Sequence, residues 1–264
     1  MSTLTAPRTG GSLGRTVKAE WIKLSSIRST WWTALAMVVM GAGFTTIISG
    51  VYAGDLADGT SGDSPAEYIT QGLIFSQISA VVIGALVVTS EYGTGMIRAT
   101  LAATPVRARV LAAKTIVVCG FLFVVGTATA FLGYFGGNAF FRNEGVGISL
   151  GDEHILRSMF GAGLYMAGLG VLAAAIGLLV RHTAAAISIV LALVFIIGQV
   201  VQLIPGTFGE WVMKLMPGNA GPGIVVPVSF GDNMLSPWTG FAVFVGEVVV
   251  LVLAGWFVLR RRDA

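Results

Sequence analysis

The chain has 264 residues, of which 55% are hydrophobic and only 11% are charged, and its mean hydropathy is +0.84. Soluble domains carry about 25% charged residues, so this composition excludes a water-soluble globular protein. The formal net charge is +3, and the single cysteine, Cys119, excludes an intrachain disulfide and a thiolate metal cluster.

Residues 13–29 show the pattern of an amphipathic helix. Apolar side chains at 13, 17, 21, 24 and 27 share one arc, although Glu20 interrupts it. This pattern predicts a helix in the headgroup layer of a membrane, anchored by Trp21, Lys23 and Arg28. A plain basic flank that only orients the first span is the alternative, and residues 1–12 are expected to form a flexible tail.

Six apolar stretches are long enough to cross a membrane. As helices they would measure roughly 32 to 42 Å, against a hydrocarbon thickness of about 30 Å. They lack the alternating pattern of a β-barrel, so we predict an all-α integral membrane protein with one transmembrane domain over 1–264. The predicted spans are 30–51, 69–90, 108–135, 157–180, 183–204 and 237–259.

The basic residues lie on one side of this arrangement. Six spans place both termini on one side, and 13 of the 16 Lys and Arg residues then fall on that side, while only Arg142, Arg157 and Lys214 fall on the other. The second side carries nine acidic residues: Asp55, Asp58, Asp63, Glu67, Glu144, Asp152, Glu153, Glu210 and Asp232. By the positive-inside rule, the first side is predicted to be cytoplasmic.

The connection between the second and third spans is organised as a short helix between two breaks. Gly93 and Gly95 should end the second span, and Met96–Ala103 should form the short helix. Thr104-Pro105 is predicted to cap and begin the next helix. Arg107 and Arg109 would then lie in its first turn, where the helix dipole disfavours cations, so we expect an acidic group to offset them: lipid phosphate, Glu91 or a partner protein.

The segment between the last two spans combines apolar side chains with helix breakers. Residues 208–216 follow helical amphipathic spacing, and the prolines and glycines of 217–227 then forbid regular helix. Such a segment must either find cover in protein or lie shallowly in lipid.

Few polar side chains lie within the spans. Glu247 is the only acidic residue at mid-span, and two interpretations remain open: direct handling of substrate or protons, or a hydrogen bond with Gln199 or Gln202. Gln71 and Gln77 give the second span a polar face that would suit a translocation path or helix packing. Pairs of small residues four apart in the fourth span, such as Gly163 and Ala167, indicate close helix packing.

The sequence lacks the residues of an enzyme that acts on its own. None of the four lysines follows a glycine, which excludes a phosphate-binding P-loop, and the two histidines, His154 and His182, fall on opposite sides of the membrane. We therefore expect no catalytic residue and no bound cofactor or metal in this chain.

The connection between the second and third spans contains a recognisable motif: Glu91, Gly93, Thr94 and Gly95, followed by Leu101, Thr104, Pro105, Arg109 and Lys114. This motif resembles the corresponding connection of type-2 ABC exporter permeases. The opening segment 19–32, together with the excess of Arg over Lys, is similar to members from high-GC Gram-positive bacteria. The resemblance covers the whole six-span plan.

The resemblance implies a function in transport across the bacterial plasma membrane. The short helix would couple to a separate ATPase subunit that binds ATP and magnesium, and the chain would pair with a second copy of itself or with a related permease, among membrane lipids and without nucleic acid. The residues implied in coupling are Glu91, Gly93, Thr94, Arg98, Thr104, Arg107 and Arg109.

The same resemblance implies export by alternating access, and a re-entrant pair of short helices before the last span. The cargo would be a drug, a lipid or another amphiphile. The candidate pathway residues are Gln71, Gln77, Gln199, Gln202 and Glu247. The competing hypothesis is an ion- or proton-coupled carrier or channel that uses Glu247. A membrane enzyme or signalling anchor would need a reactive cluster that the sequence does not contain.

Overall fold

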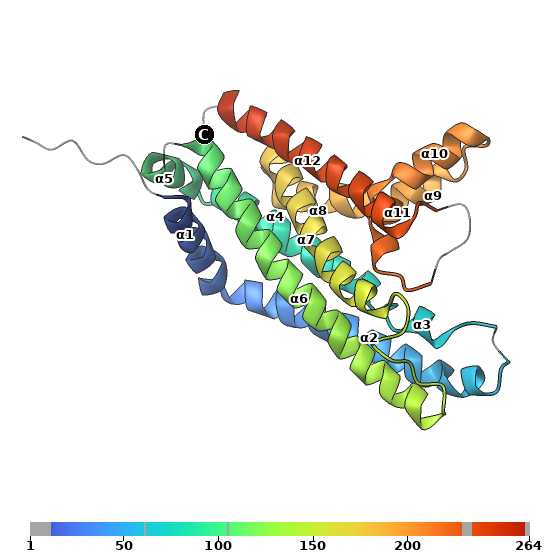
Figure 1. Cartoon of the computed structure of the whole chain (residues 1–264). Coiled ribbons are helices and arrows are strands. Elements are labelled where there is room, and N and C mark those ends of the chain that lie inside the picture. Colours follow the sequence, from blue (N-terminus) through green and yellow to red (C-terminus); the bar gives the residue numbers. More distant parts are fainter. Residues whose placement is uncertain (1–11, 61, 105, 229–233, 262–264) are drawn as a thin grey trace, which may run out of the picture.

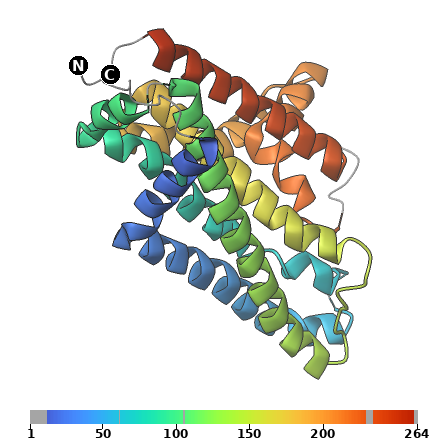
Figure 2. The ribbon, with the colours of Figure 1, turned by 60° about the vertical axis from the view of Figure 1, so that its left-hand side comes forward.

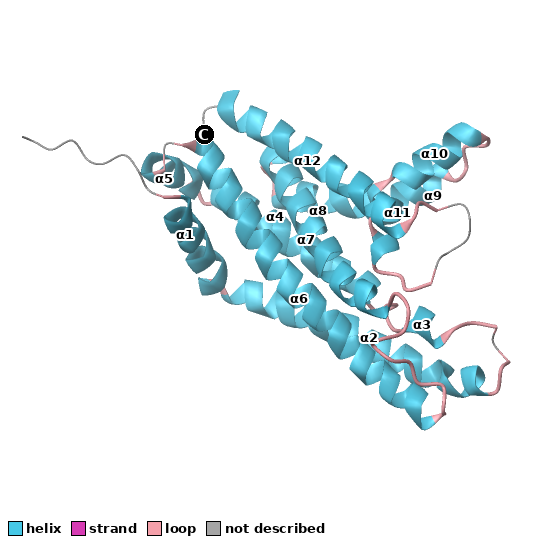
Figure 3. Ribbon diagram, viewed as in Figure 1, coloured by secondary structure: helices cyan, strands magenta, loops and turns pink. Residues whose placement is uncertain are grey.

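The structure is a computed structural model that describes residues 12–60, 62–104, 106–228 and 234–261. Every regular element in these ranges is a helix (Figure 3). Six helical stretches are long and apolar enough to cross a membrane, which confirms the prediction of an all-α integral membrane protein: Arg28–Ala57, Pro65–Gly93, Arg107–Asn143, Ile155–Val180, Thr183–Val201 and Pro237–Arg261.

The two described ends of the chain lie at the same end of the bundle (Figures 1 and 2). Helix α1 (Leu13–Ser26), helix α5 (Met96–Ala103), the start of α6 (Arg107–Asn143) and the last turn of α12 (Pro237–Arg261) gather there. We call this the α5 end. The short helix α3 (Pro65–Tyr68) and the turn at 144–154 lie at the opposite end, the α3 end.

The charges separate between these two ends as predicted. Among the described residues, the basic side chains of α1, α5 and α12 all belong to elements that gather at the α5 end. Arg142, Arg157 and Lys214 belong to parts of α6, α7 and α10 away from it. Arg8, Arg262, Asp232 and the predicted flexible tail up to residue 11 lie outside the described residues. Which membrane side the α5 end faces stays a prediction.

Helix α7 (Ile155–Val180) is the centre of the bundle. In its most apolar stretch 78% of the residues are buried, against 22% for α12. Glycines let α4 (Leu73–Gly93) approach it closely: a Cβ at Gly84 would lie 2.1 Å from the carbonyl oxygen of Gly170. The spacing of small residues in the fourth span therefore serves helix packing, as predicted.

Helices α2 (Arg28–Ala57) and α6 both run further toward the α3 end than the sequence predicted. The predicted spans ended at 51 and 135, whereas the helices end at Ala57 and Asn143. The glycines at 136 and 137 are weak helix formers, but they allow α6 to lie directly against α2, where Thr46 and Ser49 fill the space. Packing thus outweighs local propensity in this stretch.

The fifth span is not one continuous α-helix. Helix α8 (Thr183–Leu191) passes into a π-helical segment, η1 (Ala192–Ile197), and then into α9 (Gly198–Val201). A π segment widens the helix and changes its hydrogen bonding from i→i+4 to i→i+5, and it is often found at functional positions. The sequence predicted a span over 183–204 and a candidate span is present at Thr183–Val201, but the sequence did not predict the π-helical segment within it.

The segment before the last span is covered by protein only in its second part, because the apolar side chains of Phe208, Trp211 and Leu215 in its first part are exposed. Helix α10 (Thr207–Leu215) is followed by two short pieces, α11 (Pro217–Ala220) and η2 (Pro222–Ile224), which pack between η1, α7 and α12. Ile224 is fully buried, and glycines at 161, 218 and 240 allow backbone to touch backbone. This cover within protein is what the re-entrant interpretation requires.

Candidate functional site

The turn between α4 and α5 is built by two glycines, as the sequence indicates. Gly93 is the last residue of α4, and Gly95 adopts a φ of +72°, a backbone conformation that side chains disfavour. Thr94 caps α4, and its Oγ1 donates a hydrogen bond to the carbonyl oxygen of Ser90 at 2.8 Å. The predicted short helix is present with the predicted bounds, Met96–Ala103.

The predicted start of α6 was wrong by two residues. Thr104 does not cap α6; it is the C-cap residue of α5, with φ −132° and ψ 88°. The residue before a proline avoids helical backbone angles, so α5 ends there, and α6 begins at Arg107 after Val106. Arg107 and Arg109 still lie in the first turn of α6. Pro105 lies outside the described residues.

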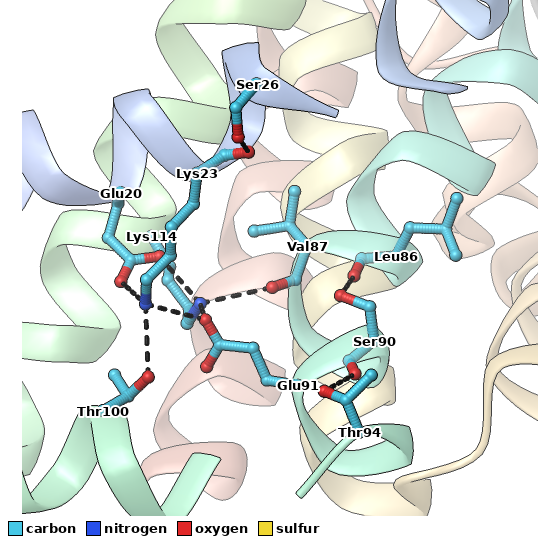
Figure 4. Close-up of polar contacts among 10 residues, drawn as sticks. All are labelled: Glu20, Lys23, Ser26, Leu86, Val87, Ser90, Glu91, Thr94, Thr100 and Lys114. Atoms are coloured by element: carbon cyan, nitrogen blue, oxygen red, sulfur yellow. Dashed lines mark hydrogen bonds and ion pairs between the residues drawn. The ribbon is translucent and has the colours of Figure 1, made fainter. Parts of the chain in front are cut away.

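Four charged side chains from three helices meet beneath α5 (Figure 4). The ammonium group of Lys114 (α6) lies 2.7 Å from a carboxylate oxygen of Glu20 (α1) and 2.7 Å from one of Glu91 (α4). Lys23 (α1) lies 2.7 Å from Glu20 and 2.9 Å from Glu91. We call these four residues the ion-pair cluster.

The ion-pair cluster also reaches α5 and the backbone of α4. Lys23 donates a hydrogen bond to Thr100 Oγ1 of α5 at 3.2 Å, and Lys114 donates one to the carbonyl oxygen of Val87 at 3.2 Å. The cluster therefore joins α1, α4, α5 and α6 through side-chain contacts (Figure 4). Burial is deep: the side chains of Glu20, Glu91 and Lys114 are 4%, 3% and 5% exposed.

The charges of the cluster balance, two positive against two negative. The pKa of Lys23 is the result of burial, which lowers it, and of the stronger combined effect of hydrogen bonds and attraction from Glu20 and Glu91, which raises it above 10.5. Because the pKa is raised, the stabilisation from Lys23 is complete at neutral pH and is lost only as the pH rises through that value.

Burial changes the role that the sequence suggested for Glu91. Its carboxylate faces Lys23 and Lys114 inside the protein, and its Oε2 has no hydrogen-bond partner among the described residues. In this arrangement Glu91 supports α5 from within instead of presenting a charge on the surface. Its place in coupling stays a prediction.

The other residues implied in coupling lie at or near the surface of the α5 end. Gly93, Thr94 and Arg98 are exposed, and Thr104, Arg107 and Arg109 are half-buried. Arg107 donates a hydrogen bond to the carbonyl oxygen of Leu259 and another, at 3.3 Å, to that of Arg260. These acceptors lie at the C-terminal end of α12, where the helix dipole is negative.

The sequence predicted an acidic group that offsets the charge of Arg107, and the structure places backbone carbonyl oxygens there instead. The carbonyl groups at the end of α12 offset its charge, and Glu91 does not, because Glu91 is engaged by the two lysines. Lipid phosphate or a partner protein as a neighbour of the two arginines stays a prediction.

The three predicted anchors have different surroundings. Arg28 is exposed at the start of α2. Trp21 is 43% exposed and its ring lies 6.1 Å from that of Phe121 on α6. Lys23 belongs to the ion-pair cluster, so its charge faces protein more than lipid. Helix α1 is thus amphipathic as predicted, but part of its apolar arc packs on α6, and Leu24 is buried.

Three of the five predicted pathway residues border one cavity. Gln71, Gln77 and Gln199 line a cavity of about 280 Å³ between α4, α7, η1 and α11. Tyr165 donates a hydrogen bond to Gln77 Oε1 at 3.3 Å within it, and Asn219 and Glu67 add further polar groups. The π-helical segment contributes Val194 and Phe195 to the wall.

Gln202 and Glu247 do not belong to this cavity. Gln202 borders a separate hollow beside α10. Glu247 is half-buried on α12, and its Oε2 has no hydrogen-bond partner among the described residues. The predicted hydrogen bond to Gln199 or Gln202 is therefore absent, because these glutamines face other hollows. A role of Glu247 in handling substrate or protons stays a prediction.

Sequence reasoning missed the joint role of Glu20 and Lys114. A signal for each was present: Glu20 interrupts the apolar arc of 13–29, and Lys114 lies inside an apolar span. A charge in such a place needs a partner of opposite sign. The structure supplies these partners from helices that are distant in sequence.

Six apolar helices long enough to cross a membrane, with a short helix at the end that carries most of the positive charge, define a multi-pass membrane protein. Residues 16–199 match the family model described as "ABC-2 family transporter protein". The match covers more than half of the chain, so the protein belongs to this family and is a membrane permease subunit of an ABC transporter.

The matched range runs from within α1 to within α9 and contains the whole ion-pair cluster. Helices α10 to α12 lie outside it. No curated protein shows significant similarity to the chain.

Proposed function

We propose that this chain exports its substrate from the bacterial cell, driven by a separate ATPase subunit that docks on α5. The α5 end would face the cytoplasm, and the ATPase would bind ATP and magnesium. The observation that carries the proposal is the buried ion-pair cluster, because it connects α5 and α1 to the spans α4 and α6 by short contacts.

Such a cluster suits the transmission of movement. A permease without a nucleotide site must receive work as displacement of a rigid element. Lys23 holds α5 through Thr100, and both lysines hold Glu91 at the end of α4. A push on α5 would then move α1, α4 and α6 together, whereas a loose loop would absorb it.

The cavity between α4, α7, η1 and α11 would form part of the transport path. Its walls mix the amides of Gln71, Gln77 and Gln199 with apolar groups, which suits a drug, a lipid or another amphiphile. Alternating access would open it to each side in turn. We expect the working form to be a dimer with a second copy or a related permease, because one copy encloses little of such a path.

The coupling proposal is tested by asking whether a neighbouring gene encodes an ABC ATPase and by co-purifying that ATPase with this chain. We expect a stable complex in which substrate raises ATP turnover. Arg98→Ala removes a long, exposed side chain from α5 without touching the ion-pair cluster, and it should weaken the complex about tenfold, the effect of losing roughly 1.4 kcal/mol of binding free energy.

Arg142→Ala is the matched control, because it removes an arginine near the α3 end and should leave the complex unchanged. Equal effects of the two substitutions would contradict docking on α5. Substrate uptake into vesicles that contain this chain alone, driven by a proton gradient, would instead support the carrier hypothesis.

A further inference from the structure

A long apolar groove lies between α6, α7 and α12. Its volume is about 630 Å³, and it is lined by residues 115–123 of α6, 164–171 of α7 and 241–253 of α12. Thr115 and Cys119 contribute the few polar atoms in its walls. Neither the ion-pair cluster nor the polar cavity borders this groove, so the transport proposal leaves it without a role.

The part of the groove nearer the α5 end, around Val249 and Leu253 of α12, lies within reach of one hydrocarbon chain of a lipid. At 1.5 Å per residue, the lining stretches of α6 and α12 extend over roughly 12 to 18 Å. One leaflet of the hydrocarbon core is about 15 Å deep. Both α6 and α12 are candidate membrane spans, so the groove lies at the depth where lipid tails are the surrounding solvent.

One end of the groove leads to exposed cations. Continuing along α12 from Leu253 toward the α5 end, the chain reaches Trp256 and then Arg260 and Arg261, both exposed. Arg260 lies over the ring of Trp256 at 4.8 Å, and Arg261 over that of Phe257 at 4.1 Å. A tryptophan followed by arginines is typical of the level where headgroups begin.

We propose that this groove binds one anionic phospholipid, with an acyl chain between α6 and α12 and the phosphate beside Arg260 and Arg261. The apolar walls recognise the chain, and the two guanidinium groups recognise the negative headgroup through charge-assisted hydrogen bonds. The lipid stabilises the arrangement of α12 beside α6, where direct packing between the two helices is sparse, whereas α12 packs closely on α7.

A second copy of the chain fits this groove less well. Two copies in one membrane related by a two-fold axis along its normal would present the same patch to each other. Arg260 and Arg261 of both copies would then meet at the same level, and like charges repel. An anionic lipid has the complementary charge.

The test uses the purified full chain, titrated with dioleoyl phosphatidylglycerol or dioleoyl phosphatidylcholine and examined by native mass spectrometry. We expect one tightly bound phosphatidylglycerol, preferred at least tenfold over phosphatidylcholine. Arg260→Gln with Arg261→Gln should abolish the preference. Arg15→Gln with Lys18→Gln is the matched control, because it removes two exposed charges from α1 at the same end and should leave the preference unchanged.

The groove itself is tested by filling it. A Cβ at Gly120 meets no atom within 4 Å, so Gly120→Phe should enter the groove without disturbing the fold and should remove the bound lipid. Gly246→Phe, on α12 and equally open but outside the groove, is the control. Val249→Phe fills the groove from α12 and provides a second test if the first variant folds poorly.

Three results would overturn the proposal. These are equal binding of the two lipids by the unmodified chain, lipid that remains bound in both filled variants, and a filled variant that turns a dimer into a monomer while the lipid stays bound. The last result would assign the groove to a second copy.

Discussion

Lys114 is the residue on which the ion-pair cluster depends most. Its ammonium group bridges Glu20 and Glu91, which are both almost fully buried. Lys114→Met keeps the length of the side chain but leaves two carboxylates facing each other in a poorly solvated place. Breaking a buried pair from one side costs about 3–5 kcal/mol, so we expect a large fall in the melting temperature of the purified chain.

Two matched substitutions separate burial from charge. Lys23→Met removes a cation that is 32% exposed, so water screens the loss and the fall should be clearly smaller. Lys214→Met removes a lysine that lies over Trp211 on α10, away from the cluster, and should have little effect. If all three variants melt alike, the cluster does not hold these helices together.

Glu247 is the residue that decides between ATP-driven and ion-coupled transport. It borders neither the polar cavity nor the ion-pair cluster. We therefore expect Glu247→Gln, which keeps the shape and removes the charge, to leave ATP-driven transport largely intact at every pH tested. Uptake in reconstituted vesicles measures this. Transport that is abolished, or that loses its dependence on pH, would support the carrier hypothesis.

At the scale of elements, the crossing of α4 and α7 is the most sensitive contact in the bundle. A Cβ at Gly84 would lie 2.1 Å from a backbone oxygen of α7, which cannot move aside as a side chain can. We expect Gly84→Ala to cost about 1–3 kcal/mol through overpacking. Gly246→Ala, where a Cβ meets no atom within 4 Å, should be harmless by the same measurement of thermal unfolding.

The elements whose causes are local could be predicted from the sequence. Gly95 and the residues around Pro105 delimit α5, so its bounds follow from backbone chemistry alone. The end of α6 could not be predicted, because it depends on the fit between Gly136 and Gly137 and the small side chains Thr46 and Ser49 of α2. The π-helical segment was missed for the same reason, since its backbone packs against Gly218 of a later segment.

The candidate site also has one part that could be predicted from the sequence and one that could not. The motif and the spacing of its residues predicted helix α5 and its exposed surface. The support beneath it could not, because Glu20 and Lys114 are 94 residues apart and nothing local indicates that they meet. Each was visible only as a charge in an apolar place, which predicts that a partner exists without identifying it.

At the scale of the whole molecule, the separation of charge predicts how the chain sits in the membrane. The α5 end gathers most of the basic side chains, and the outer turns near the α3 end are acidic. By the positive-inside rule, segments rich in Lys and Arg stay on the cytoplasmic side of the membrane. This rule would place α1, α5 and the end of α12 inside the cell. That orientation is also the only one in which a cytoplasmic ATPase can reach α5.

Labelling of single cysteines tests this orientation. Cys119→Ser removes the native thiol, and Glu144→Cys or Arg15→Cys then places one on an exposed position at the α3 end or the α5 end. A membrane-impermeant maleimide should label Glu144→Cys on intact cells and should label Arg15→Cys only after the membrane is opened. The reverse pattern would place α5 outside the cell, where no ATP-hydrolysing subunit could move it.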